Sequence, residues 1–172
     1  MPQSTIIKMG NKKLLTLSMP IESPMKINSE TKLLIGDLID TMKAENGVGI
    51  AAPQIGINKR IIIFGFTENK RYPNKPPIPL TVLINPEVRI LSNELVYGWE
   101  GCLSVPGLRG LVPRYSQIEY SGFDEKGQFV KRIVDEFHAR VVQHEYDHLN
   151  GILYPQRMED MTYFGYEDEL IA

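Results

Sequence analysis

Apolar residues recur with helical spacing in two stretches of the chain. The first lies between residues 28 and 47, and its apolar face consists of Leu34, Ile35, Leu38, Ile39 and Met42. The second lies between residues 135 and 151, and its stripe consists of Phe137, Val141, Val142, His144, His148 and Leu149. Both stretches predict amphipathic helices. We expect Asp135 to cap the start of the second helix and Gly151 to follow its end.

Between these helices the pattern changes to that of strands. The β-branched run from Arg60 to Phe66 predicts a buried strand, and residues 81–91 predict another. Asn85-Pro86 interrupts the second strand, which indicates an edge position or a bulge. Residues 117–123 and 128–134 predict a hairpin, with Ile118 and Tyr120 on one face. The order of helix, strands and helix predicts an α+β fold.

The remaining stretches give weaker patterns. Residues 1–27 predict an extended arm, and residues 69–79 hold four prolines and predict an exposed loop. The tail after Gly151 is acidic at its end and is compatible with a short helix or a loosely ordered segment. No repeat or linker is found, so we expect one domain over residues 1–172.

Composition narrows the class of protein. The chain has 172 residues, 42% of them hydrophobic, and a net charge of −2, which argues against nucleic-acid specificity. No apolar run reaches the ~18 residues of a membrane span, and the first ten residues lack the apolar core of a secretory signal. The single cysteine, Cys102, fits a reducing compartment, so a cytoplasmic location is expected.

Within the second predicted helix lies His144-Glu145-Tyr146-Asp147-His148, an HExxH pattern. Positions i and i+4 of a helix lie on one face, so two imidazoles at this spacing can hold one metal ion. Glu145 follows His144 by about 100° around the helix axis, so its carboxylate can serve as a general base. The pattern also arises by chance, but the apolar stripe places both histidines on the inward face, where unpartnered rings would be costly.

A metal site of this kind needs a third protein ligand. The metzincin spacing fails because Tyr154 stands where a histidine is required. Glu167 is compatible with a thermolysin-like site, although its acidic neighbours indicate a solvated tail. Cys102 is the preferred ligand, since a thiolate suits a borderline-soft ion. The competing role for Cys102 is that of a nucleophile paired with histidine.

Three segments resemble, in order, the signature motifs of peptide deformylases. They are Gly47-Val-Gly-Ile-Ala-Ala-Pro-Gln54, Glu100-Gly-Cys-Leu-Ser104 and Gln143-His-Glu-Tyr-Asp-His148, and the similarity covers nearly the whole chain. The first segment also mimics a dinucleotide fingerprint, but it follows a predicted helix rather than a strand. The resemblance implies antiparallel β-sheets packed around a central helix that carries the HExxH motif.

The resemblance also implies a reaction and its residues. The enzyme would remove the formyl group from the N-terminal formyl-methionine of nascent polypeptides and release formate. Cys102, His144 and His148 would bind the metal, and Glu145 would transfer the proton. The Gln54 amide and the backbone N–H of Leu103 would stabilise the oxyanion. The implied peptide-binding residues are Val48, Gly49, Gly101, Phe137, Val141 and Arg109.

Cofactor and partners follow from the same resemblance. One divalent ion is implied, Fe²⁺ in vivo, with Zn²⁺, Ni²⁺ or Co²⁺ as alternatives. The partners are N-formyl-methionyl peptides. A transient contact with the ribosome is a further alternative, which the short C-terminal tail does not decide. Glu100 would either form a hydrogen bond near the metal or lie at the rim of the site. Arg109 and Arg114 could alternatively be ordinary surface charges. An endopeptidase that uses Glu167 and a non-catalytic peptide-binding module are the competing functions.

Overall fold

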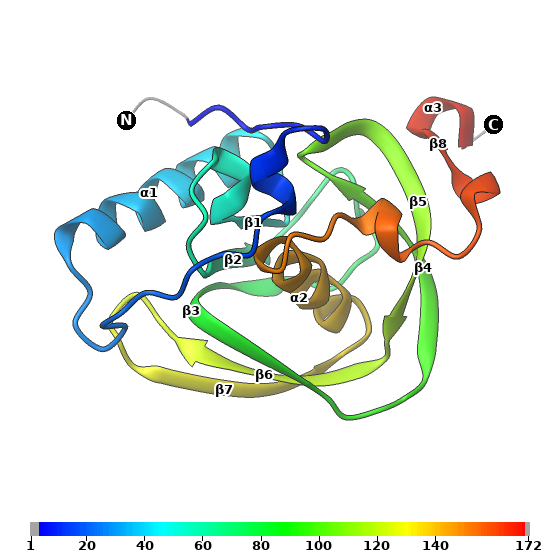
Figure 1. Ribbon diagram of the computed structural model, residues 1–172. Helices are drawn as coiled ribbons and strands as arrows, with labels where there is room; N and C mark the ends of the chain where they lie inside the picture. The colour runs from blue at the N-terminus through cyan, green and yellow to red at the C-terminus, as the bar shows by residue number, and fades with distance from the viewer. Residues whose placement is uncertain (1–3, 171–172) are drawn as a thin grey trace.

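A long helix, α2 (Glu136–Leu149), lies at the centre of the molecule between two antiparallel sheets (Figure 1). The computed structural model describes residues 4–170. The larger sheet has the strand order β1-β2-β3-β6-β7 and the smaller one β4-β5-β8. A second long helix, α1 (Ser29–Ala44), covers the opposite side of the larger sheet. The expected α+β fold with antiparallel sheets is confirmed.

The strands and short helices have the following bounds. The larger sheet contains β1 Gly49–Ala51, β2 Ile61–Phe66, β3 Ile78–Ile90, β6 Gln117–Phe123 and β7 Phe129–Asp135. The smaller sheet contains β4 Leu95–Cys102, β5 Val105–Tyr115 and β8 Phe164–Tyr166. The short helices are η1 Lys12–Leu15, η2 Ala52–Ile55, η3 Tyr154–Arg157, η4 Met161–Tyr163 and α3 Glu167–Leu170.

Strand β2 shows why the larger sheet has an apolar face on each side. Its residues alternate, so Ile61 and Ile63 pack on the α1 side while Ile62 and Phe64 pack on the α2 side. Because helices cover both faces, every residue from 61 to 65 is buried. The run therefore contains apolar residues throughout, without the polar alternation of a strand that has one face in water.

Most of the predicted elements are present near their expected bounds. Helix α1 begins after Asn28, whose side chain accepts a hydrogen bond from Thr31 N at 2.8 Å. The hairpin β6–β7 is formed, with Ile118 and Tyr120 both buried. Gly151 follows α2 with a φ of 71°, a left-handed conformation that glycine adopts without strain. The extended arm is described from residue 4 onward, and residues 1–3 lie outside the described part.

Two details differ from the sequence predictions, and the structure decides one alternative between an edge and a bulge. Asp135 stands at the N-cap of α2, but its side chain makes no capping hydrogen bond. Strand β3 is an interior strand, so Asn85-Pro86 marks a bulge rather than an edge; Asn85 has a φ of 51° and the register shifts there. The tail ends in the short helix α3, one of the two predicted alternatives, but strand β8, which precedes α3 and pairs with β5, was not predicted. Within residues 4–170, no helix is long and apolar enough to cross a membrane.

Candidate active site

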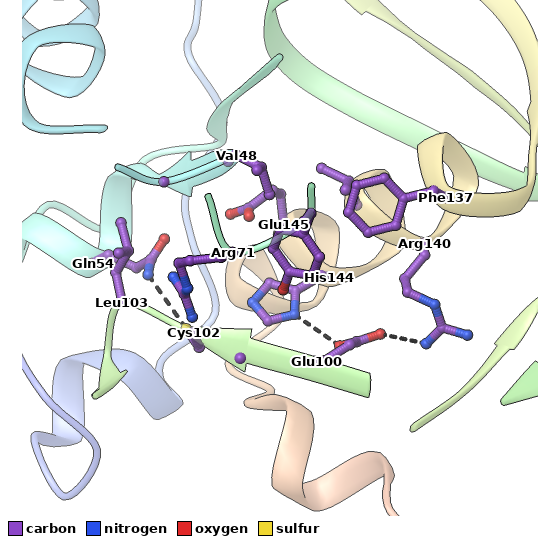
Figure 2. A pocket seen from close by; sticks show the side chains of 15 residues that line it. Val48, Gln54, Arg71, Glu100, Cys102, Leu103, Phe137, Arg140, His144 and Glu145 are labelled. Atoms are coloured by element: carbon purple, nitrogen blue, oxygen red, sulfur yellow. Dashed lines mark hydrogen bonds and ion pairs between the residues drawn. The ribbon is translucent and has the colours of Figure 1, made fainter. Parts of the chain in front are cut away.

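Helix α2 carries three buried polar side chains at the site, of which the two histidines face the smaller sheet and the glutamate lies against β1. His144, Glu145 and His148 are 9%, 4% and 1% exposed. The two imidazole rings lie 5.2 Å apart between centroids, as expected for side chains one turn apart. Polar groups buried to this degree require partners. For the two histidines these partners come from strand β4, on the other side of the cavity (Figure 2).

Strand β4 ends at Cys102, which completes a compact group of possible metal ligands. The Cys102 Sγ lies 3.3 Å from Nε2 of His148. One ligand atom from each of Cys102, His144 and His148 lies within 4.8 Å of the others. One thiolate and two imidazoles form a donor set that suits Zn²⁺ or Fe²⁺. The residues present therefore fit the metal that the sequence motifs imply.

Glu100, two residues before Cys102, fixes the orientation of His144. Its Oε2 lies 2.8 Å from His144 Nδ1, which leaves Nε2 of the ring directed toward Cys102 and His148. A carboxylate in this position sets the tautomer of a metal-ligating histidine. The expected hydrogen bond near the metal is present, and Glu100 is 3% exposed, so it is not a rim carboxylate.

Two buried arginines neutralise Glu100. Arg114 donates to both carboxylate oxygens at 2.8 and 2.9 Å, and Arg140 donates to Oε1 at 2.8 Å. Burial alone would raise the pKa of Glu100, but Arg114 and His144 outweigh it and hold that pKa well below its usual range. Arg114 also donates to Asp147 on α2 at 2.5 Å. The interpretation of Arg114 as a surface charge is therefore wrong.

Glu145 has a different environment, although it is adjacent to His144. Its Oε2 has no hydrogen-bond partner among the described residues, and burial raises the pKa of this carboxyl to about 7. A Cβ on Gly49 would lie 2.3 Å from Oε1, so only glycine at that position lets the carboxylate approach β1. A buried carboxylate with a pKa near neutrality can accept and return a proton at neutral pH.

Gln54 approaches the metal-ligand group from η2. Its Oε1 accepts from Ala51 N at 2.8 Å, so its Nε2 is turned toward Cys102 Sγ at 3.5 Å and Ser104 Oγ at 3.2 Å. Leu103 lines the same cavity immediately after Cys102. The structure thus places the expected amide donor beside the Cys102 sulfur.

A cavity in front of these groups brings together most of the expected peptide-binding residues. Its lining includes the expected Val48, Gly49, Gly101, Phe137 and Val141. It also includes Arg71, Tyr72 and Arg140, which were not predicted from the sequence. Arg140 lies on the inward stripe of α2, four residues before His144, so helical spacing was a signal for it. Arg71 and Tyr72 lie in the proline-rich loop, where no pattern marked them.

Arg109 is the expected peptide-binding residue that lies outside this cavity. Its Nε lies 2.8 Å from Oε1 of Glu167, and its guanidinium stacks over Tyr72 at 5.3 Å. It lines a neighbouring cavity together with Arg71 and Tyr72. Because Glu167 pairs with Arg109 and is absent from the metal-ligand group, the thermolysin-like alternative has no support in the structure.

The fold and the site define a class of protein, a hydrolase of the metal-dependent HExxH type in which a cysteine from a β-strand faces the two histidines. The model of the polypeptide deformylase family matches residues 3–163. The chain therefore belongs to the polypeptide deformylase family, whose members remove the N-terminal formyl group from nascent peptides.

Individual relatives agree with this assignment. Peptide deformylase 2 of Ralstonia nicotianae is 53% identical over 165 residues, which cover 96% of this chain and 92% of the relative. Peptide deformylase 1 of Bordetella pertussis is 54% identical, with coverages of 96% and 93%. The crystal structure of class I type b peptide deformylase from Acinetobacter baumannii, bound to Met-Ala-Ser, superposes with a TM-score of 0.87. It is 39% identical and covers 91% of this chain and 99% of its own.

Proposed function

We propose that this chain hydrolyses the formyl amide of N-formyl-methionyl polypeptides with one divalent ion held by Cys102, His144 and His148. The observation that carries this proposal is the convergence of the three ligand atoms within 4.8 Å beside the unpartnered Glu145 carboxylate. When bound, a divalent ion supplies a Lewis acid that lowers the pKa of water and polarises a carbonyl. The thiolate and imidazole donors are compatible with Fe²⁺ as the native ion and with Zn²⁺, Ni²⁺ or Co²⁺ as substitutes.

Glu145 is proposed to move the proton. Its carboxylate accepts a proton from the attacking water and then delivers it to the amine nitrogen as the C–N bond breaks, which yields formate and a free N-terminus. The buried position beside Gly49 keeps the carboxylate close to the cavity and away from other hydrogen-bond donors.

Gln54 and Leu103 are proposed to stabilise the oxyanion that develops on the formyl carbonyl. The Gln54 Nε2 is held beside Cys102 by the bond from Ala51 N to its Oε1, so little reorganisation is needed. The backbone N–H of Leu103 is the second donor. Loss of one such donor typically lowers the rate by about 10²–10³.

The peptide is proposed to lie as an extended strand between β1 and β4. Val48 and Gly49 would border it on one side and Gly101 on the other, with Phe137, Val141 and His144 around the methionine side chain. Pairing through the main chain tolerates many sequences beyond the first residue. Arg109 would contribute from the neighbouring cavity. Because the substrate emerges from the ribosome, the proposal includes a transient encounter with ribosomes in the cytoplasm.

Formate release from formyl-Met-Ala-Ser tests the function, with casein cleavage as the control for endopeptidase activity. We expect formate release and intact casein. Cleaved casein without formate would support an endopeptidase, and binding without either product would support a peptide-binding module. Anaerobic purification followed by metal analysis identifies the ion, and one equivalent of Fe²⁺ is expected.

A further inference from the structure

A second cavity adjoins the active site and has a strongly basic wall. Its volume is about 380 Å³, and the described residues that line it include Arg71, Lys75, Arg109 and Arg140 but no carboxylate. The aromatic rings of Tyr72 and Trp99 form other parts of the wall. Arg71, Tyr72, Phe137 and Arg140 also line the active-site cavity, so these side chains border both cavities.

The four cations differ in whether the protein neutralises them. Arg109 pairs with Glu167, and Arg140 pairs with Glu100. Within residues 4–170, by contrast, no carboxylate lies within ion-pair distance of the Arg71 guanidinium or the Lys75 amine. The described residues also offer the Arg71 guanidinium no hydrogen-bond acceptor. The Arg71 nitrogens are not among the buried polar atoms that lack a partner, so the guanidinium reaches solvent and can accept a ligand in place of water.

The backbone that carries Arg71 is nevertheless well anchored. Arg71 N donates to Asn69 Oδ1 at 2.9 Å, and Arg71 O accepts from Arg109 Nη2 at 3.2 Å. Asn69 donates in turn to Asn46 O at 2.9 Å, and the Tyr72 ring packs on Phe137 at 4.9 Å. The structure therefore fixes the position of the Arg71 backbone and leaves its charged end available.

The charged end of Arg71 lies where the peptide is proposed to bind. A Cβ on Gly101 would be 2.5 Å from Arg71 Nη2, so the guanidinium rests directly on the β4 backbone (Figure 2). The active-site cavity retains only about 30 Å³ with the side chain in this position. A peptide strand bordered by Gly101 must therefore contact Arg71 or displace its guanidinium toward the adjoining basic cavity.

The geometry of an extended strand indicates which substrate residue would reach that cavity. Side chains alternate between faces, so the first and third residues point to the same side, about 7 Å apart. Phe137 lines both cavities, so with the methionine side chain against this ring a third side chain on the same face comes within reach of the adjoining basic cavity. Resting on the proposed placement of methionine, we propose that Arg71 and Lys75 form a subsite for an acidic side chain at the third residue of the formylated chain.

Carboxylate chemistry suits this subsite. A guanidinium presents two parallel N–H donors that match both oxygens of a carboxylate, and Lys75 adds a second positive charge from the loop. Because both cations are partly exposed, the preference for an acidic over a neutral third residue is that of a screened ion pair. We expect it to be about two- to fivefold in kcat/KM and to decrease as the salt concentration rises.

The test compares three peptide amides that differ only at the third residue, formyl-Met-Ala-Glu, formyl-Met-Ala-Gln and formyl-Met-Ala-Lys. Amides remove the C-terminal carboxylate, which could otherwise occupy the subsite. For the wild-type protein we expect kcat/KM to fall in the order Glu, Gln, Lys, with a smaller spread in high salt. In Arg71→Gln the ratio of Glu to Gln peptide should approach one, and in Arg71→Glu the Lys peptide should become the preferred substrate.

Lys126→Gln is the matched control, because it removes one positive charge from an exposed turn and should leave the wild-type ratios unchanged. Equal kcat/KM for the three peptides in the wild type would refute the subsite while leaving the deformylase function intact. A uniform loss for all three peptides in Arg71→Gln, with the ratios preserved, would also refute it. Absence of formate from every peptide would instead contradict the proposed function.

Discussion

Helices α1 and α2 are similar in length and in apolar periodicity, but they bury different residues. Of the 16 residues of α1, five are buried, and the only polar ones are the threonines Thr31 and Thr41. Of the 14 residues of α2, eleven are buried, and six of these are polar or charged: Arg140, Gln143, His144, Glu145, Asp147 and His148. An apolar stripe is sufficient to hold a helix on a sheet, as α1 shows. Buried charges cost stability and are not needed for packing, and in this comparison they occur on α2, the helix that lines the active site.

The charges of α2 belong to two groups with opposite requirements. Asp147 and Arg140 belong to a network with Arg114 and Glu100 in which each charge has a partner within 2.9 Å. Glu145, on the cavity side of the same helix, has an unpartnered oxygen. The paired group fixes geometry, and the unpaired group is left free to react. Substitutions in the two helices can test this distinction.

The largest effect is expected from Cys102→Ser. A serine hydroxyl is a much poorer ligand than a thiolate for a borderline-soft ion, so the protein should lose most of its metal and nearly all formate release. Metal content per protein, measured together with activity after anaerobic purification, checks this expectation. The side chains are similar in size, so the melting temperature of the metal-free proteins should match. A Cys102→Ser protein with full metal and full turnover would exclude the sulfur as a ligand.

Glu145→Gln should separate chemistry from metal binding. Loss of a general base typically lowers the rate by about 10²–10⁴, while the three ligand atoms remain in place. We therefore expect formate release to collapse with the metal content unchanged. Asp40→Asn on α1 is the matched control, because Asp40 is an exposed helical carboxylate and its neutralisation should leave both readouts at wild-type values. Wild-type turnover in Glu145→Gln would refute the proton-transfer role.

Glu100→Gln should have a smaller effect on metal affinity but a clear effect on stability. Groups that orient a metal-ligating histidine typically contribute about 10–100-fold in affinity or activity. The substitution also leaves Arg140 without a carboxylate partner and Arg114 with Asp147 alone, and an uncompensated buried charge of this kind costs about 3–5 kcal/mol. Competition with a chelator measures the affinity, and denaturant unfolding of the metal-free protein measures the stability. Unchanged values in both would show that Glu100 does not orient His144.

The sequence predicted the elements that local apolar spacing determines, and it did not predict those that depend on pairing with distant strands. Apolar periodicity was sufficient for α1, β2, the β6–β7 hairpin and α2, because each buries an apolar face through local spacing. Strand β8 was missed because its three residues form a strand only through pairing with β5. At Asn85-Pro86 the sequence predicts either an edge or a bulge, and only the pairing of β3 with its neighbours, which is not a local property, decides for the bulge.

Among the site residues, those on α2 followed from helical spacing, whereas several from distant segments did not. Spacing along α2 predicted that His144 and His148 share a face. Thiolate chemistry favoured Cys102 as their third ligand, and the family resemblance implied the same set, whose ligand atoms lie within 4.8 Å of one another in the structure. The Arg114 network was missed because a charged residue in a strand gives no signal of its buried partners. Arg71 was missed because it lies in a loop whose sequence pattern predicts only exposure.

The smallest effect on catalysis is expected from Leu38→Ala in α1, although it should cost considerable stability. Leu38 is fully buried against the larger sheet, and such truncations destabilise by about 2–5 kcal/mol. No residue of α1 lines the active-site cavity, so kcat/KM per folded molecule should stay at the wild-type value. Denaturant unfolding and formate release below the unfolding midpoint give the two readouts. A fall in kcat/KM comparable to that of Glu100→Gln would mean that α1 helps to position the site and that the division between the helices is wrong.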